Sequence, residues 1–103
     1  MGGEYVSVWE YLVAPEHTDR FLEAYGPSGE WVRLFRRARG HLRTELLRDR
    51  SRPERFVTID HWESREAWDA FRQACGREYE ELDARCAALT THEARIGELE
   101  SLP

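Results

Sequence analysis

Four segments of the chain are rich in β-branched and aromatic residues or alternate between apolar and polar positions, and these patterns predict four β-strands. In the second segment, Leu42, Thr44 and Leu46 fall on one face, as in a half-buried strand. The fourth segment alternates less regularly and contains Gly97, which weakens strand pairing. The predicted strands cover residues 4–13, 41–49, 55–63 and 91–100.

Between these strands, apolar residues recur three and four positions apart, which predicts amphipathic helices. The clearest pattern ends at Gly40, where we expect a left-handed residue to close the helix. Its apolar face comprises Trp31, Leu34, Phe35 and Ala38. Ser64 is well placed to cap a later helix that Gly76 interrupts. The helical segments are residues 16–26, 30–40, 65–75 and 77–89, with a break at residues 26–29.

The order of these elements predicts one domain that spans residues 1–103. A strand, a broken helix, two strands, a second broken helix and a last strand are typical of a ferredoxin-like α+β sandwich, with a four-stranded antiparallel sheet and helices on one face. The other face of the sheet is too apolar to remain exposed, so we expect a homodimer through it. The residues expected there are Val6, Val8, Leu12, Val57 and Ile59.

The charge pattern argues against two classes of partner. The formal net charge is -5, and the basic residues lie among acidic neighbours, so no basic face for nucleic acid or an anionic membrane is predicted. Apolar runs are too short to cross a bilayer, and the first residues show no basic and apolar leader pattern. We therefore expect a cytoplasmic protein.

The side-chain inventory excludes several reactions. The chain has no lysine, which rules out Schiff-base chemistry on a lysine amine. Cys75 and Cys86 fall in one helical region about 16 Å apart, too far for a disulfide, and are expected to be core thiols. The histidines are scattered and no CxxC is present, so no metal site is predicted.

The sequence from Trp62 to Ser64, W-E-S, ends a strand and caps the next helix. Residues 30–46 cross from helix through glycine to strand, and residues 58–71 cross from strand to helix. Together with W-E-S, these passages resemble the antibiotic biosynthesis monooxygenase family. The resemblance runs from about Val6 to Glu100 and implies a dimeric α+β barrel. In that family the tryptophan of W-x-S points into a cavity between sheet and helices.

If Trp62 points into such a cavity, strand alternation sends Asp60, Thr58 and Phe56 the same way. His61, Ile59 and Val57 would then face the partner subunit. The polar and aromatic residues of this strand would belong to two surfaces, one for a ligand and one for a second chain.

The family includes oxygenases that need no cofactor, so the resemblance implies oxidation of a flat aromatic molecule, such as an anthrone, by O2 without metal or flavin. A base near a dry, aromatic-lined cavity serves that chemistry. Trp62, Asp60 and His41 are the candidate catalytic residues. The candidate substrate-binding residues are Trp9, Tyr11, Trp31, Phe35, Thr58, Trp68, Phe71 and Tyr79.

Two alternatives remain open at this point. Asp60 can instead pair with an arginine such as Arg43 on the neighbouring strand, and the same fold can serve as a non-catalytic binding or stress-response module with a self-filled pocket. The haem-degrading branch of the family is disfavoured, because the chain has no asparagine and Arg72 stands where its axial histidine would be.

Overall fold

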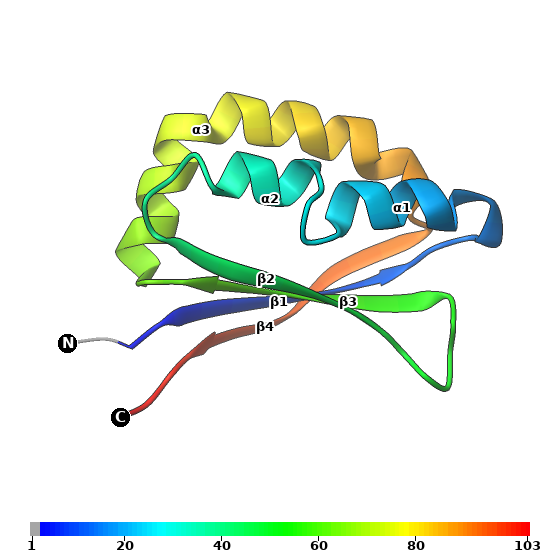
Figure 1. The fold of residues 1–103 in the computed structure, drawn as a ribbon, viewed down its shortest axis with the longest axis horizontal. Coiled ribbons are helices and arrows are strands. Elements are labelled where there is room, and N and C mark those ends of the chain that lie inside the picture. The colour runs from blue at the N-terminus through cyan, green and yellow to red at the C-terminus, as the bar shows by residue number, and fades with distance from the viewer. Residues whose placement is uncertain (1–2) are drawn as a thin grey trace.

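The computed structural model describes residues 3–103, in which four antiparallel strands form one sheet with the helices on one face (Figure 1). The strand order β2-β3-β1-β4 puts the first and third strands at the centre. This confirms the ferredoxin-like α+β fold predicted from the element order. The strands are β1 (Tyr5–Leu12), β2 (His41–Arg48), β3 (Arg55–Trp62) and β4 (His92–Glu100).

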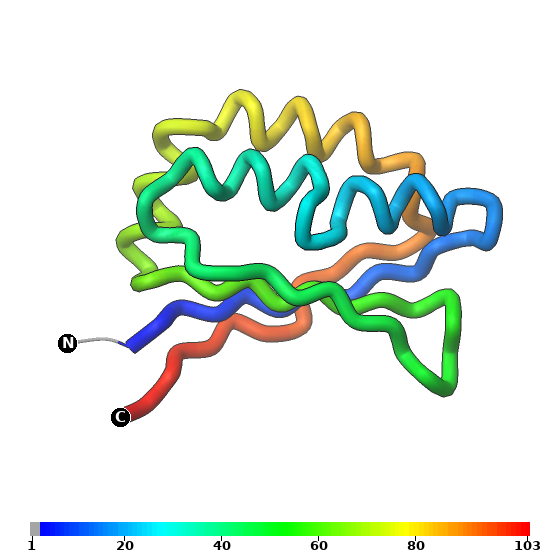
Figure 2. The backbone as a smooth tube through the Cα atoms, viewed as in Figure 1, coloured from blue at the N-terminus to red at the C-terminus, as the bar shows by residue number. Residues whose placement is uncertain are grey.

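The helices form a single layer above the sheet, and the β2–β3 connection extends away from it (Figure 2). The longest helix starts at Ser64, whose hydroxyl accepts a hydrogen bond from the amide of Ala67 at 3.1 Å. It bends at Cys75, next to the predicted break at Gly76. The helical elements are η1 (Pro15–His17), α1 (Thr18–Tyr25), α2 (Glu30–Phe35), α3 (Arg65–Cys86) and η2 (Ala87–Leu89).

The segment before β2 differs from its prediction. The helix expected to reach Gly40 ends at Phe35, because the amides of Arg37 and Ala38 bond to the third residue before them. Ala38, for example, donates to the carbonyl of Phe35 at 3.0 Å. Gly40 does not adopt a left-handed conformation. It is needed because the chain passes close to α3: a Cβ there would lie 2.3 Å from Cβ of Ala67.

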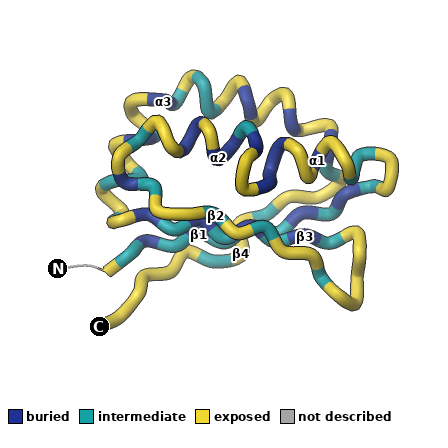
Figure 3. The backbone as a smooth tube through the Cα atoms, in the orientation of Figure 1, coloured by how far each residue is buried: buried dark blue, intermediate teal, exposed yellow. Residues whose placement is uncertain are grey.

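Strand β3 has two different faces, as its alternation predicted. One side is buried beneath the helices and carries Phe56, Thr58, Asp60 and Trp62, while Val57, Ile59 and His61 are half-buried on the other side. Figure 3 shows buried residues gathered where the helices face the sheet, with much of β4 exposed.

Strand β2 contains a register shift that the sequence pattern did not reveal. His41 pairs with Trp62 and Arg43 pairs with His61, so two steps on β2 match one step on β3. The prediction of a half-buried strand fails at Leu42, which is 43% exposed. The same shift brings His41 to the side of the sheet on which Thr44 lies.

The side of the sheet away from the helices, here called the open face, is apolar along its centre. Val6, Val8, Leu12, Val57 and Ile59 are half-buried in the single chain, as expected for residues on this side. The register adds Leu47 opposite Val57 and Leu99 opposite Val6, which are 47% and 55% exposed.

Two further properties concern the helices. Cys75 and Cys86 are buried and unbridged, as predicted. Within residues 3–103, none of the helices combines the length and the apolar composition needed to cross a bilayer.

The close approach at Gly40 can be tested with a pair of substitutions. Gly40→Ala should lower the free energy of unfolding by about 1–3 kcal/mol, because the added methyl group overlaps Ala67. Gly76→Ala meets nothing within 4 Å and should leave stability unchanged or raise it by up to about 1 kcal/mol. Urea unfolding followed by circular dichroism measures both, and equal effects would contradict the packing described.

Candidate functional site

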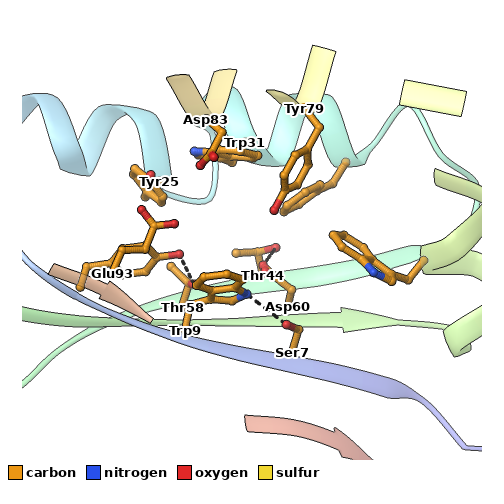
Figure 4. A pocket seen from close by; sticks show the side chains of 13 residues that line it. Ser7, Trp9, Tyr25, Trp31, Thr44, Thr58, Asp60, Tyr79, Asp83 and Glu93 are labelled. Atoms are coloured by element: carbon orange, nitrogen blue, oxygen red, sulfur yellow. Dashed lines mark hydrogen bonds between the residues drawn. The ribbon is translucent and has the colours of Figure 1, made fainter. Parts of the chain in front are cut away.

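A small cavity lies between the sheet and the helices, lined by residues from all four strands and from α1, α2 and α3 (Figure 4). Its volume is about 30 Å³. That is room for roughly one or two water molecules. The lining residues are Ser7, Trp9, Tyr11, Tyr25, Trp31, Phe35, Thr44, Thr58, Asp60, Trp68, Tyr79, Asp83 and Glu93.

Aromatic rings form most of the cavity wall. Trp31 and Tyr79 meet edge to face with ring centroids 5.0 Å apart, and Trp9 is held over the sheet by a 3.2 Å hydrogen bond from its indole to Ser7. Part of the cavity wall is less tightly packed, because Trp9, Trp68 and Tyr79 are only half-buried. Burial raises the pKa of the phenols of Tyr11, Tyr25 and Tyr79, so all three stay protonated at neutral pH.

Asp60 is the buried carboxyl of the cavity, with only 8% of its surface exposed. Its Oδ1 accepts a 2.8 Å hydrogen bond from the hydroxyl of Thr44 on β2, as Figure 4 shows. Burial raises the pKa of Asp60 to about 6, although the Thr44 hydrogen bond and nearby His61 oppose that shift. The carboxyl therefore titrates close to neutral pH, which suits proton transfer.

The alternative pairing of Asp60 with Arg43 does not occur. Arg43 is exposed and lies opposite His61 in the sheet, on the open face. His61 also points away from the cavity, with Nε2 2.8 Å from a carboxylate oxygen of Glu45.

His41 lies outside the cavity lining but is connected to it through Thr44. Its Nε2 is 2.9 Å from the Thr44 hydroxyl, and its ring packs against those of Phe35 and Trp62 with centroids 5.4 and 5.2 Å away. Burial, together with Arg36 and His61 nearby, lowers the pKa of His41 to about 4. The imidazole is therefore neutral at pH 7.

Trp62 faces the helices but does not line the cavity. It has no exposed surface, and its ring packs against Phe35, Trp68 and Phe71 with centroids 5.2 to 5.5 Å away. Its indole nitrogen is buried without a hydrogen-bond partner. The expectation of open space beside this ring is wrong, because large neighbouring rings fill it; Phe71 is likewise a core residue.

The structure brings most of the predicted residues together. Three of the candidates, Trp62, His41 and Phe71, do not line the cavity. The candidates that line it are Asp60, Trp9, Tyr11, Trp31, Phe35, Thr58, Trp68 and Tyr79. Sequence reasoning missed Ser7, Tyr25, Thr44, Asp83 and Glu93 as lining residues. Ser7 could be predicted from alternation with Trp9 and Tyr11. Thr44 lies opposite Asp60 because of the register in which β2 pairs with β3, and that register is not visible in the pattern of either strand alone.

All charged groups that line the cavity are carboxyls: Asp60, Asp83 and Glu93. Partial burial and the neighbouring Asp83 raise the pKa of Glu93. These groups favour a neutral or cationic guest over an anionic one. In residues 3–103, no three His, Cys, Asp or Glu side chains are grouped so that they could hold a metal ion.

Comparison with known proteins gives the family. The family model described as antibiotic biosynthesis monooxygenase matches residues 5–84, and the chain belongs to this family. A search of curated proteins gives no match.

Solved structures share the fold at low identity. PA3566 from Pseudomonas aeruginosa is 18% identical, with a TM-score of 0.74 over 100% of this chain and 98% of that one. Protein SO0527 from Shewanella oneidensis is 17% identical, with a TM-score of 0.75 over 98% and 93%. SnoaB, a cofactor-independent oxygenase from Streptomyces nogalater, is 22% identical, with a TM-score of 0.66 over 98% of each chain.

Asp60 should make stability depend on pH. Its folded pKa of about 6 lies above the ordinary value of 3.8, so the folded state binds the proton more tightly and loses stability as pH rises from 4 to beyond 6. Asp60→Asn should raise the free energy of unfolding above that of the unmodified protein by on the order of 3 kcal/mol at pH 7.5, and by little at pH 3.5.

Urea unfolding at the two pH values measures this difference. Glu80→Gln on the exposed side of α3 is the control and should change stability little at either pH. A pH-independent difference between Asp60→Asn and the unmodified protein would show that the carboxyl is not destabilised by burial.

Proposed function

We propose that this protein is a cofactor-independent monooxygenase that binds a flat aromatic molecule in the cavity and oxidises it with O2. The observation that carries this proposal is the buried carboxyl of Asp60 among aromatic rings, in a chain of the antibiotic biosynthesis monooxygenase family. Aromatic walls suit a flat ring system, and a base that titrates near neutral pH suits a weakly acidic substrate.

The proposed reaction uses Asp60 as the base, with an anthrone as the example. Asp60 takes one proton from the ring methylene, and the resulting carbanion gives an electron to O2. The two radicals combine to a peroxide, whose O–O bond breaks with loss of water as the carbonyl forms. Asp60 returns its proton to the departing oxygen, and the second C–H bond of the same carbon breaks, giving its proton to that oxygen and its electrons to the carbonyl. One methylene and one O2 thus give one carbonyl and one water. A dry cavity favours the electron transfer.

The cavity must enlarge to admit such a guest, because about 30 Å³ holds only water. Trp9, Trp68 and Tyr79 are the half-buried aromatic residues of its wall, and these side chains can move at least cost. Tyr11, Trp31 and Phe35 are at most 7% exposed and form its fixed part.

The small volume also favours a second candidate function, a non-catalytic binding or stress-response module whose pocket is filled by its own side chains. The close packing around Trp62 supports this alternative, because it leaves that indole no contact with the cavity.

Oxygen consumption separates the two functions. With anthrone as a neutral probe, we expect O2 uptake above the uncatalysed rate, and Asp60→Asn should reduce it by about 100-fold or more because the base is lost. Glu80→Gln, away from the cavity, should keep the activity of the unmodified protein. An absence of uptake across anthrone and related phenols would favour the non-catalytic module.

Trp62→Phe provides a further control. If the indole acts only as packing, the variant should lose stability while turnover of the folded fraction stays close to normal, measured below its melting temperature. Loss of turnover with normal stability would instead assign Trp62 a direct part in the reaction.

We also propose that the protein is a homodimer joined through the open face. Seven apolar side chains lie there, partly exposed in the single chain: Val6, Val8, Leu12, Leu47, Val57, Ile59 and Leu99. A patch of this kind is rarely left in water.

Light scattering at micromolar concentration should give about twice the chain mass of 12.2 kDa. Ile59→Glu, at the centre of the open face, should give the single-chain mass because it would bury an unpaired charge. Leu22→Glu on α1, which is also partly exposed but lies in the helix layer, should leave the dimer intact. A single-chain mass for the unmodified protein would refute the dimer.

A further inference from the structure

The two oxygens of the Asp60 carboxyl have different surroundings. Oδ1 is bonded to the Thr44 hydroxyl, which in turn is 2.9 Å from Nε2 of His41. Within the described chain, Oδ2 of Asp60 and Nδ1 of His41 make no hydrogen bond to another residue. The fully buried polar atoms that lack a partner do not include either of them, so both atoms keep some exposed surface. Oδ2 is therefore open to the cavity that Asp60 lines, and Nδ1 is accessible from outside the cavity lining.

The chemistry of the three groups fixes the direction of these hydrogen bonds. An ionised carboxylate only accepts, and Thr44 has a single hydroxyl hydrogen, which it donates to Oδ1. The Thr44 oxygen must then accept from Nε2–H of His41, so that Nδ1 carries the lone pair. When Asp60 is protonated on Oδ1, both hydrogen bonds can reverse: Oδ1–H then donates to Thr44, and the Thr44 hydroxyl donates to Nε2 of His41.

The register shift in β2 makes the hydrogen bond between His41 and Thr44 possible. In a regular strand, positions 41 and 44 point to opposite faces, because they differ by an odd number of residues. The extra residue between His41 and Arg43 brings both side chains beneath the helices. Bulges of this kind commonly redirect a side chain beside a functional site.

We propose that Thr44 and His41 are positioning residues that hold Oδ1 of Asp60 and conduct protons between this carboxyl and solvent, leaving Oδ2 free for the guest. A hydronium ion in solvent gives a proton to Nδ1 of His41 and becomes water, as the Nε2–H bond breaks and a new O–H bond forms at Thr44. The original Thr44 O–H bond breaks as an O–H bond forms at Oδ1. One proton enters and the carboxylate becomes neutral; the reverse sequence releases it, and no electrons are exchanged between molecules.

Such a path matters when the cavity is occupied. A flat guest would displace the water in the cavity and cover Oδ2, so Asp60 could not exchange a proton with solvent on that side. The outer end of the path, His41, lies outside the cavity lining, so a guest in the cavity would not cover it. Its use in catalysis rests on the proposed function, whereas the coupling among the three residues does not.

Other titratable or charged groups surround the path on several elements. Arg36, which follows α2, and His61 of β3 influence His41, and His61 also acts on Asp60. On the cavity side stand Tyr11 of β1, Tyr79 and Asp83 of α3 and Glu93 of β4. Thr44 donates a hydrogen bond to Asp60, so a substitution at Thr44 tests the coupling most directly.

The first experiment uses the protein without any guest. Carbon-13 NMR of aspartate-labelled protein follows the titration of Asp60, with its signal assigned by its absence in Asp60→Asn. Thr44→Val removes the hydrogen bond to the charged form and should raise the midpoint by about one pH unit. Thr44→Ser keeps the hydroxyl and should leave the midpoint within about 0.3 unit. Equal midpoints in the Val and Ser variants would overturn the proposed coupling.

The second experiment tests proton conduction during anthrone oxidation. His41→Ala should lower kcat by about tenfold, with KM little changed, because the outer end of the path is missing. Added imidazole should restore turnover, whereas pyrazole, of the same shape but a much weaker base, should not. Equal rescue by both would show that His41 only fills space. His41→Gln replaces the alanine variant if that variant is unstable. Glutamine can donate a hydrogen bond to Thr44 but does not titrate, so the kcat of His41→Gln should also be low.

The two experiments separate the possible failures. If the unmodified protein oxidises no anthrone, the proposed function fails while the NMR titration still decides the coupling of Asp60 to Thr44. If turnover is present but the Thr44→Val titration is unchanged, the monooxygenase stands and the path is wrong.

Discussion

The burial of one carboxyl beneath a layer of aromatic rings is the constraint on which this structure depends. Alternation in β3 leaves no choice: a strand that sends Phe56 and Trp62 into the core also sends Asp60 there. A lone carboxylate in such surroundings is unfavourable, and a single hydrogen bond from Thr44 only partly offsets that cost. The raised pKa of Asp60 is the direct consequence, and it gives the cavity a group that titrates near neutral pH.

Sequence reasoning predicted those features that depend on local periodicity. The fold, the two faces of β3, the cap at Ser64 and the break near Gly76 follow from alternation, helical spacing and side-chain type, all of which are local. The register of β2 does not, because it depends on which residue is left unpaired opposite β3. That unpaired residue decides the side of the sheet on which His41 lies. The Thr44–Asp60 pair follows instead from the regular register nearer the β2–β3 turn, and sequence reasoning considered Arg43 in place of Thr44.

Cavity shape was beyond sequence reasoning for a different reason. The direction of Trp62 followed from alternation, but the space beside it depends on how neighbouring rings pack. Phe35, Trp68 and Phe71 come from two helices and meet around this indole, so no spacing within a single element indicates their contact. The volume of the cavity results from many such contacts, and this volume distinguishes an open binding pocket from a filled core.

The distribution of exposure among the aromatic residues limits how the cavity can work. Tyr11, Trp31 and Phe35 are buried, so moving them would break contacts throughout the core, whereas Trp9, Trp68 and Tyr79 already lie partly in solvent. A guest of the proposed kind would therefore have to enter by displacing these half-exposed rings and would reach Asp60 from that side. Thr44, which is hydrogen-bonded to His41, contacts the same carboxyl from β2. The edge rings would then select the guest, while the protonation of Asp60 would be controlled independently from β2.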